Sequence, residues 1–147
     1  MKRLLFILIF STSASLFSQT GPQNLIDDFF TTYEKDAGKA VEELYATNEW
    51  TERRKDDIDK IIGTVNGFTE SYMGKYYGYE IITTKKFSES FVLYSYLIKY
   101  DRQPLRFIFK FYKPNDIWVL YSYSLDDNLD DEIQEAAKLY YLDLDKN

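Results

Sequence analysis

The alternation of side chains between residues 105 and 125, "LRFIFKFYKPNDIWVLYSYSL", constrains the fold more than any other feature of this chain. Large apolar side chains occupy every second position before the turn, which is the period of a β-strand with one buried face. Since a slip of one residue would turn every side chain to the opposite face, the pattern predicts which face packs on a core. The predicted inward residues are Leu105, Phe107, Phe109 and Phe111.

The Pro-Asn-Asp turn at residues 114–116 sets the pairing of the strands on either side of it. A three-residue loop suits these residue types, because proline is pre-set for a type I turn and aspartate tolerates a left-handed conformation. This loop places Phe111 beside Val119. A two-residue loop would send Trp118 inward, and we discount it because it would leave the apolar odd-numbered set outside. The predicted inward residues of the last strand are Ile117, Val119, Tyr121, Tyr123 and Leu125.

Four strand-like runs fill the second half of the chain, at residues 75–84, 87–100, 105–113 and 117–125. The links between them are of hairpin length, which favours an antiparallel meander. On the second strand, Tyr96 is expected opposite Phe109 and Ile98 opposite Phe107. The predicted inward residues of this strand are Val92, Tyr94, Tyr96, Ile98 and Tyr100.

Helices are expected before and after these strands. An apolar stripe predicts one over residues 23–33, and Asp36 can cap a second, short helix. A longer amphipathic helix is expected to run through Ile58 and Tyr72 and to stop at Gly74. The fold class predicted is α+β, with N-terminal helices packed on a curved four-stranded antiparallel sheet and a C-terminal helix. That last helix is expected to bury Leu129, Ile133, Ala137 and Tyr140.

The opposite face of the predicted sheet is also rich in apolar side chains. A contiguous exposed apolar band of roughly a few hundred Å² usually marks an interface. Two arrangements would cover it: the C-terminal helix folds across it, or two copies of the chain join through it as a homodimer. The predicted interface residues are Phe91, Leu93, Leu97, Ile108, Trp118 and Leu120.

Residues 1–18 have the layout of a secretory signal peptide, with Lys2 and Arg3 followed by an apolar run that ends at Phe10. The run is much shorter than the roughly 20 residues that span a bilayer, and no membrane span is expected in the mature chain. We therefore expect export to the periplasm or the extracellular space, with residues 19–147 as a single domain. Since the chain has no cysteine, we do not expect a lipoprotein.

Charge and composition exclude several classes of function. The formal charge of −6 becomes −8 once Lys2 and Arg3 leave with the signal peptide, so neither nucleic acid nor an anionic membrane is an expected partner. The sequence contains no histidine, which rules out a Ser-His-Asp triad and a zinc site of histidine and cysteine ligands. We predict no catalytic residue, no metal site and no cofactor.

The acidic run "LDDNLDDE" at residues 125–132 invites comparison with a calcium-binding loop. An EF-hand loop needs glycine at its sixth position and glutamate at its twelfth, and counting from Asp126 these positions hold Asp131 and Ala137. Carboxylates at the start of a helix are instead favourable because they face the positive end of its dipole. The run is therefore interpreted as a helix start.

Helices followed by a long antiparallel sheet, over about residues 22–125, resemble the NTF2-like (cystatin-like roll) superfamily. The segments that carry the resemblance are "DDFFTTYEKD", the following "AVEELYATNEW" and the closing strands. The helix from Leu129 departs from the usual ending on a strand. The resemblance implies a cone of helices and sheet, and pairs of subunits that join through the outer sheet face. The chain also looks like secreted proteins of the Bacteroidetes, whose signals often end in a similar "FSQ".

That superfamily contains enzymes similar to ketosteroid isomerase as well as binding scaffolds, so the fold alone implies no function. Our leading hypothesis is a non-enzymatic binding domain for a small apolar or aromatic ligand, or for a protein partner such as an envelope protein. The alternative is an isomerase or lyase with an aspartate base and a tyrosine hydroxyl in an aromatic-lined pocket. The predicted ligand-binding residues are Tyr94, Tyr96 and Tyr121.

Overall fold

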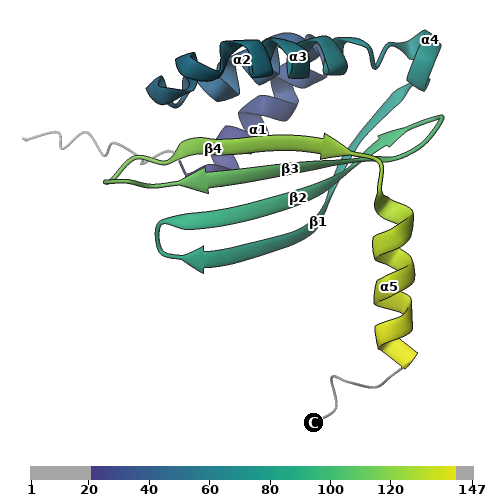
Figure 1. The fold of residues 1–147 in the computed structure, drawn as a ribbon. Coiled ribbons are helices and arrows are strands. Elements are labelled where there is room, and N and C mark those ends of the chain that lie inside the picture. The colour runs from purple at the N-terminus through teal and green to yellow at the C-terminus, as the bar shows by residue number, and fades with distance from the viewer. Residues whose placement is uncertain (1–20, 142–147) are drawn as a thin grey trace, which may run out of the picture.

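The computed structural model describes residues 21–141, and the fold is α+β (Figure 1). A layer of helices packs on an antiparallel sheet, and a last helix extends from the end of the sheet. The predicted signal peptide lies outside the described residues. The elements in chain order are α1 (Pro22–Tyr33), α2 (Ala37–Ala46), the 3-10 helix η1 (Glu49–Arg54), α3 (Lys55–Asn66), α4 (Glu70–Met73), β1 (Tyr76–Ser88), β2 (Phe91–Tyr100), β3 (Leu105–Tyr112), β4 (Val119–Asp126) and α5 (Leu129–Tyr141).

The four strands form the predicted antiparallel meander, in the order β1-β2-β3-β4. Helices α1, α2 and α3 lie over one face of this sheet (Figure 1). We call that face the inner face and the opposite one the outer face. Because the sheet is open, β1 and β4 are edge strands whose outward backbone groups have no strand to pair with.

The first two helices form where apolar residues recur at helical spacing, behind a proline in α1 and a side-chain cap in α2. Pro22 lies in the first turn of α1, where its missing N–H would have no intrahelical partner. The carboxylate of Asp36 accepts a hydrogen bond from the backbone N of Lys39 at 2.9 Å and so caps α2, as predicted. The buried residues of the pair are Ile26, Phe29, Phe30, Tyr33, Gly38, Ala40, Val41, Leu44 and Tyr45.

The long helix expected through Ile58 and Tyr72 is divided into α3 and α4, so this prediction was wrong. The helix α3 ends before Gly67, whose backbone N–H donates to the carbonyl of Gly63 at 3.2 Å. Glycine has a low helix propensity, and two glycines within five residues weaken the helix at this point. Gly74 ends α4 as predicted, in the left-handed region with φ +77°.

The first hairpin turns later than the sequence pattern indicated. The expected link at residues 85–86 is part of β1, and the turn is formed by Glu89 and Ser90. Three register shifts in the β1–β2 pair absorb the additional residues. Lysines at 85 and 86 are compatible with a strand here because β1 is an edge strand, where charged side chains reach solvent.

The pairing of β2 with β3 is two residues away from the predicted register, because Tyr96 pairs with Phe107 and not with Phe109. An even shift leaves every side chain on its predicted face, so the inward set of β2 is confirmed. The link between the strands is residues 101–104, as expected, but its backbone forms hydrogen bonds outside the hairpin. The N–H of Asp101, for example, donates to the carbonyl of Lys75 at 3.2 Å.

A β-bulge at Tyr121 reverses the predicted facing of the first half of β4. Phe111 pairs with Leu120, whereas the preceding residue of β3, Lys110, pairs with Ser122, which leaves Tyr121 as the additional residue. Leu120, predicted outward, is fully buried, and Tyr121, predicted inward, is 55% exposed. Beyond the bulge the predicted facing returns, and Tyr123 is buried.

Three further predictions for the residues before the bulge were also wrong. The turn between β3 and β4 is longer than the three residues predicted, because Tyr112 pairs with Val119 and the loop spans residues 113–118. Trp118, predicted outward, packs against the core, and Ile117, predicted inward, is exposed. The physical reason lies at the end of α2, which binds the backbone of β4 next to the bulge and holds that part of the strand under the helices.

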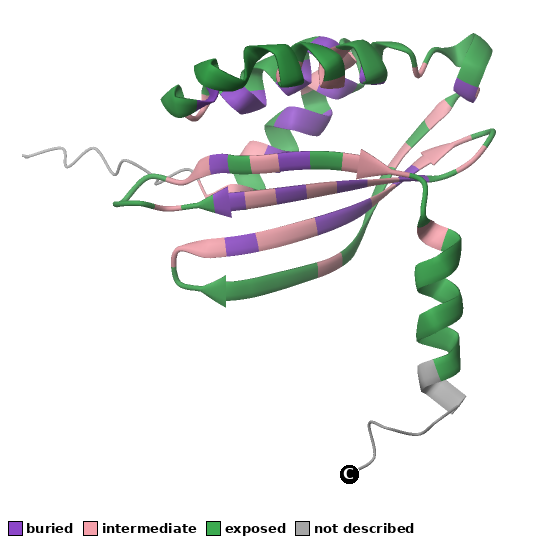
Figure 2. Cartoon of the chain, viewed as in Figure 1, coloured by how far each residue is buried: buried purple, intermediate pink, exposed green. Residues whose placement is uncertain are grey.

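Aromatic rings fill the space between α1 and the inner face. The ring of Phe29 lies edge-on to that of Phe109, with centroids 5.1 Å apart, and 5.6 Å from that of Tyr123. Figure 2 shows the buried residues on the facing sides of the helices and the sheet. The predicted inward residues of β3 are confirmed, since Leu105, Phe107, Phe109 and Phe111 are all buried.

The packing predicted for α5 is wrong, because this helix points away from the sheet (Figure 2). Every residue from Asp130 to Lys138 is exposed, Ala137 included, and Ile133 is 69% exposed. Leu129 is half-buried, and the side chain of Tyr140 lies outside the described part of the chain. The described helix therefore does not fold across the outer face, which was one of the two arrangements considered for covering it.

The position of α5 has a local cause at the end of the sheet. The guanidinium of Arg106 binds the carboxylate of Asp126 at 3.0 Å and also that of Glu132 in the first turn of α5. Opposite charges beside it keep the pKa of Arg106 above its usual value even though desolvation by burial acts to lower it. This partly buried guanidinium ties the first turn of α5 to the edge of the sheet.

Candidate functional site

The three predicted ligand-binding tyrosines do not converge on one pocket. Tyr94 and Tyr96 lie on the inner face of β2, and Tyr121 lies on the other face of the sheet. Tyr96 is buried, and its hydroxyl accepts a hydrogen bond from the side-chain amide of Gln23 at 3.2 Å. The interior that these residues were expected to line is occupied by side chains of the protein itself.

The polar groups of this interior are tyrosine hydroxyls. The hydroxyls of Tyr33 and Tyr100 lie 2.9 Å apart and share a hydrogen bond. Burial raises the pKa of Tyr33 and of Tyr123 above the usual value for tyrosine, so both hydroxyls stay protonated. Apart from tyrosines, the buried polar side chains among the described residues are those of Thr51 and Ser95, neither of which is a carboxylate that could serve as a base.

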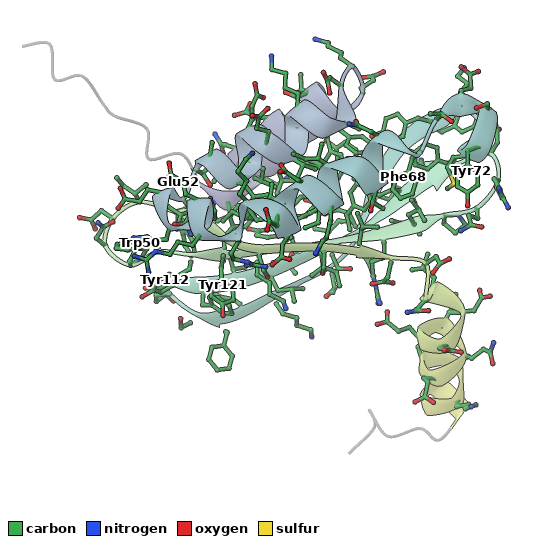
Figure 3. All side chains as sticks on the ribbon, turned by 45° about the horizontal axis from the view of Figure 1, so that its top comes forward. Trp50, Glu52, Phe68, Tyr72, Tyr112 and Tyr121 are labelled. Atoms are coloured by element: carbon green, nitrogen blue, oxygen red, sulfur yellow. The ribbon has the colours of Figure 1, made fainter. Side chains whose placement is uncertain are left out.

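An open hollow lies at the end of the sheet where η1 meets the β3–β4 loop. Its volume is about 430 Å³, which is in the range of small-ligand sites. Trp50 is 66% exposed at its rim, and Tyr112 and Ile117 are exposed beside it. Figure 3 shows Trp50 and Tyr112 at the same end of the molecule, with Glu52 from the same helix η1 nearby. We call this the Trp50 hollow.

Trp50 is held in place by its own helix start. The side-chain Oδ1 of Asn48 accepts a hydrogen bond from the backbone N of Trp50 at 3.1 Å and caps η1. The hydroxyl of Thr51 donates to the carbonyl of Tyr45 at 2.9 Å, which ties η1 to α2. The guanidinium of Arg53 stacks 5.3 Å from the centre of the indole ring. The tryptophan is therefore exposed, while the backbone beneath it is fixed.

A cluster of exposed aromatic rings continues from the Trp50 hollow onto the outer face. The ring of Phe91 lies 5.3 Å from that of Tyr121, 6.3 Å from that of Phe87 and 6.4 Å from that of Tyr112. We call these four residues the aromatic patch. Tyr112 belongs both to the patch and to the lining of the Trp50 hollow, so the two form one continuous surface.

The rest of the outer face is less apolar than predicted, and two of its six predicted interface residues are elsewhere. Trp118 and Leu120 face the core, as described above. Leu93, Leu97 and Ile108 remain on the outer face and are partly exposed. The remaining predicted residue, Phe91, lies in the aromatic patch. Lysines interrupt the apolar residues, because Leu93 pairs with Lys85 on one side and with Lys110 on the other.

A second hollow, of about 420 Å³, lies in the helix layer between α2, η1 and α3. Its floor is apolar and includes Tyr45, Ile58 and Ile62, and Glu52 and Lys55 are among the charged residues at its rim. Away from both hollows, Tyr72 on α4 stacks with the guanidinium of Arg102, 4.7 Å from the ring centre (Figure 3). Exposed aromatic residues thus occur in several places among residues 21–141, and at the Trp50 hollow they adjoin a cavity of about 430 Å³.

Sequence reasoning missed the Trp50 hollow. The available signal was a tryptophan in the strongly polar segment "TNEWTERR", where a large aromatic side chain has no apolar neighbours to pack with.

No protein-family model, curated protein or solved structure matches this chain. Among residues 21–141, no three or more acidic side chains gather into a group able to hold a metal ion. Within the same residues, no helix has the length and apolar character to cross a bilayer.

Proposed function

We propose that this chain is an exported, non-enzymatic binding domain whose recognition surface is the Trp50 hollow together with the aromatic patch. The observation that carries the proposal is the exposure of Trp50 and Tyr112 around a cavity of about 430 Å³. Exposed aromatic rings on a fixed backbone offer a large contact area at a small cost in conformational entropy. The interior, in contrast, is filled by aromatic side chains, and within the described part of the chain it holds no buried carboxylate for the alternative isomerase chemistry.

The chemistry of the surface indicates what it binds. Aromatic rings favour flat apolar groups, and the hollow is large enough for one ring system. Glu49 and Asn115 at the rim can bind a polar substituent on such a group. The ligand is therefore an aromatic or apolar group, carried by a small molecule or by the side chain of a protein partner.

We also propose that the chain is exported and that it belongs to the NTF2-like superfamily. The segment that supports export is residues 1–18, with its basic start and short apolar run. The order of helices before an open antiparallel sheet supports the superfamily. We also propose that two copies associate through the outer face, because Leu93, Leu97 and Ile108 are partly exposed there.

Binding of indole, followed by amide and side-chain NMR shifts, tests the proposed recognition surface. We expect saturable shifts at Trp50, Tyr112 and Ile117, with a dissociation constant on the order of millimolar for a ligand of this size. Trp50→Ala should weaken binding about tenfold. The matched control is Tyr72→Ala, which removes a ring of similar exposure far from the hollow and should leave binding unchanged.

A short peptide with one phenylalanine, such as acetyl-Gly-Phe-Gly-amide, distinguishes the two sources of the aromatic group. Tighter binding of the peptide than of indole would identify a protein partner, and the reverse order would identify a small molecule. If the shifts spread over the surface without saturation, or if Trp50→Ala binds indole as well as the unchanged protein does, the proposed surface is wrong.

A further inference from the structure

The helix α5 is amphipathic, yet its apolar side packs against nothing in the described chain. Leu129, Ile133 and Ala137 recur every four residues and therefore lie along one side of the helix. A helix of 13 residues is only marginally stable in water unless its apolar side is buried. Since the described residues of α5 after Leu129 are exposed, burial of that side requires a surface that residues 21–141 of the single chain do not provide.

The outer face has the apolar residues to provide such a surface. Leu93 and Leu97 follow each other along β2, and Ile108 pairs with the small Ser95 that lies between them. These residues form a shallow apolar strip that is partly exposed along the middle of the sheet. A 13-residue helix is about 20 Å long, which is the length of about six strand residues, so one helix laid along β2 covers the strip from Leu93 to Leu97.

The charges of α5 are opposite to those beside Leu93, whereas beside Leu97 the outer face carries Glu80, which is paired with Lys99 at 2.7 Å. Between residues 130 and 138, α5 has four acidic side chains and one lysine. On the outer face, Lys85 and Lys110 lie on either side of Leu93. A helix that placed its apolar side on Leu93 would bring its acidic flanks close to these two lysines. Complementary charge of this kind favours one partner and one orientation over others.

The junction between β4 and α5 directs the helix away from its own sheet. Only Asp127 and Asn128 separate the two elements. The guanidinium of Arg106 binds both Asp126 and Glu132, which fixes the first turn of α5 against the end of the strand. Figure 1 shows that α5 then runs away from the sheet, so that the outer face and the helix form an open corner. A second copy can enter this corner.

We propose that α5 is an arm that two copies of this chain exchange, each laying its helix along β2 on the outer face of the other. The Ile133 side of the arm covers Leu93, Leu97 and Ile108 of the second copy, and its acidic flanks face Lys85 and Lys110 of that copy. An arm about 20 Å long and about 10 Å wide covers roughly 200 Å². Each subunit gives one arm and receives one, so roughly 400 Å² of each is buried, which is the size of a weak, reversible interface. The inference rests on the proposed association through the outer face.

Cross-linking between two single-cysteine variants tests the exchange, because the natural sequence contains no cysteine. One full-length chain carries Ile133→Cys, the other carries Leu93→Cys, and the mixture is treated with a short bismaleimide. We expect cross-linked pairs that contain one chain of each kind to dominate over pairs of identical chains, as measured by intact mass. The matched control replaces Ile133→Cys with Gln134→Cys, whose side chain is equally exposed but lies on another side of α5. Its yield of mixed pairs should be several-fold lower.

A chain that carries both substitutions shows which copy receives the arm. Cross-links between chains support the exchange, whereas cross-links within one chain mean that α5 folds onto its own sheet and overturn it. Sedimentation of Ile133→Ser provides the second measurement. Its dimer dissociation constant should rise about ten- to a hundredfold, as expected for exposure of a buried isoleucine, and Gln134→Ser should leave it unchanged.

Two outcomes separate this inference from the association on which it rests. If the protein sediments as a dimer but the mixed cross-links are no more abundant than in the control, the arm is wrong and association through other contacts stands. If the protein stays monomeric at all concentrations, both are wrong, and the indole experiment still decides the recognition surface independently.

Discussion

The side-chain Nδ2 of Asn48 donates a hydrogen bond to the backbone oxygen of Leu120 at 2.8 Å, across 72 residues of sequence. The neighbouring Thr47 accepts a hydrogen bond from the backbone N of Leu120 at 3.1 Å. Both backbone groups of this edge-strand residue are therefore paired with the end of α2, so no second strand is needed to satisfy them. Because Asn48 also caps the helix of Trp50, one side chain links the candidate site to the sheet.

Asn48→Ala should lower the free energy of unfolding by about 1 to 3 kcal/mol. The substitution removes the cap of η1 and leaves the carbonyl of Leu120 without its partner. Urea denaturation followed by circular dichroism measures the change. Asn24→Ala, at an exposed position of α1, serves as the control and should leave stability unchanged or slightly raised, since alanine is the better helix former. Equal midpoints for the two variants would contradict the role assigned to Asn48.

Deletion of Tyr121 should be tolerated, which is unusual for a residue inside a strand. Without it, Leu120 would still face inward opposite Phe111 and Ser122 would still face outward, because the deletion removes only the bulge. We expect cooperative unfolding and a loss of stability of no more than about 2 kcal/mol. Deletion of Ser124, which sits in the regular part of β4, would instead turn the end of the strand over. A protein that unfolds after the first deletion but not after the second would refute this assignment of the bulge.

Tyr123→Phe should leave stability unchanged or raise it by up to about 1 kcal/mol. The hydroxyl of Tyr123 is buried and has no hydrogen-bond partner in the described part of the chain, so the native state gains little from it. Tyr33→Phe is the matched comparison, because it removes the hydrogen bond between Tyr33 and Tyr100. That variant should lose about 0.5 to 1.5 kcal/mol. Thermal unfolding of both proteins measures the difference, and the opposite order of stabilities would show that the Tyr123 hydroxyl contributes to the fold.

Asp101 should make the stability of the protein sensitive to acid. Its carboxylate accepts a hydrogen bond from the backbone N of Lys75 at 2.6 Å, which holds the pKa of this carboxyl below its usual value. A lowered folded-state pKa contributes stability above the unfolded-state pKa of about 4, and the contribution is lost as the pH falls through the folded-state value. We therefore expect Asp101→Asn to show a smaller drop in unfolding midpoint between pH 6 and pH 2 than the unchanged protein.

The control for the acid experiment is Asp116→Asn, at an exposed aspartate of the β3–β4 loop. Its midpoint should fall with pH as steeply as that of the unchanged protein. If Asp101→Asn keeps the full acid dependence, the hydrogen bond to Lys75 is not coupled to folding.

Several features of this fold could be predicted from the sequence because they depend on local periodicity. The alternation of Phe107, Phe109 and Phe111 identified the inner face of β3, and the spacing of Phe29 and Phe30 identified the buried side of α1. Such patterns report which side of an element is apolar, and burial of that side is the strongest term in folding. The α+β class and the antiparallel meander follow from the same information.

The remaining features depend on contacts between residues that are far apart in the sequence. The bulge at Tyr121 exists because the end of α2 holds Leu120, and no pattern within β4 indicates that contact. The candidate site could not be predicted for the same reason, since Trp50 and Tyr112 meet only after η1 has docked beside β4. Arg106 likewise decides the direction of α5. In most elements, the local sequence pattern therefore determined which residues of this protein are buried. Hydrogen bonds and ion pairs between distant residues decided the strand register, the bulge and the surface that the protein presents.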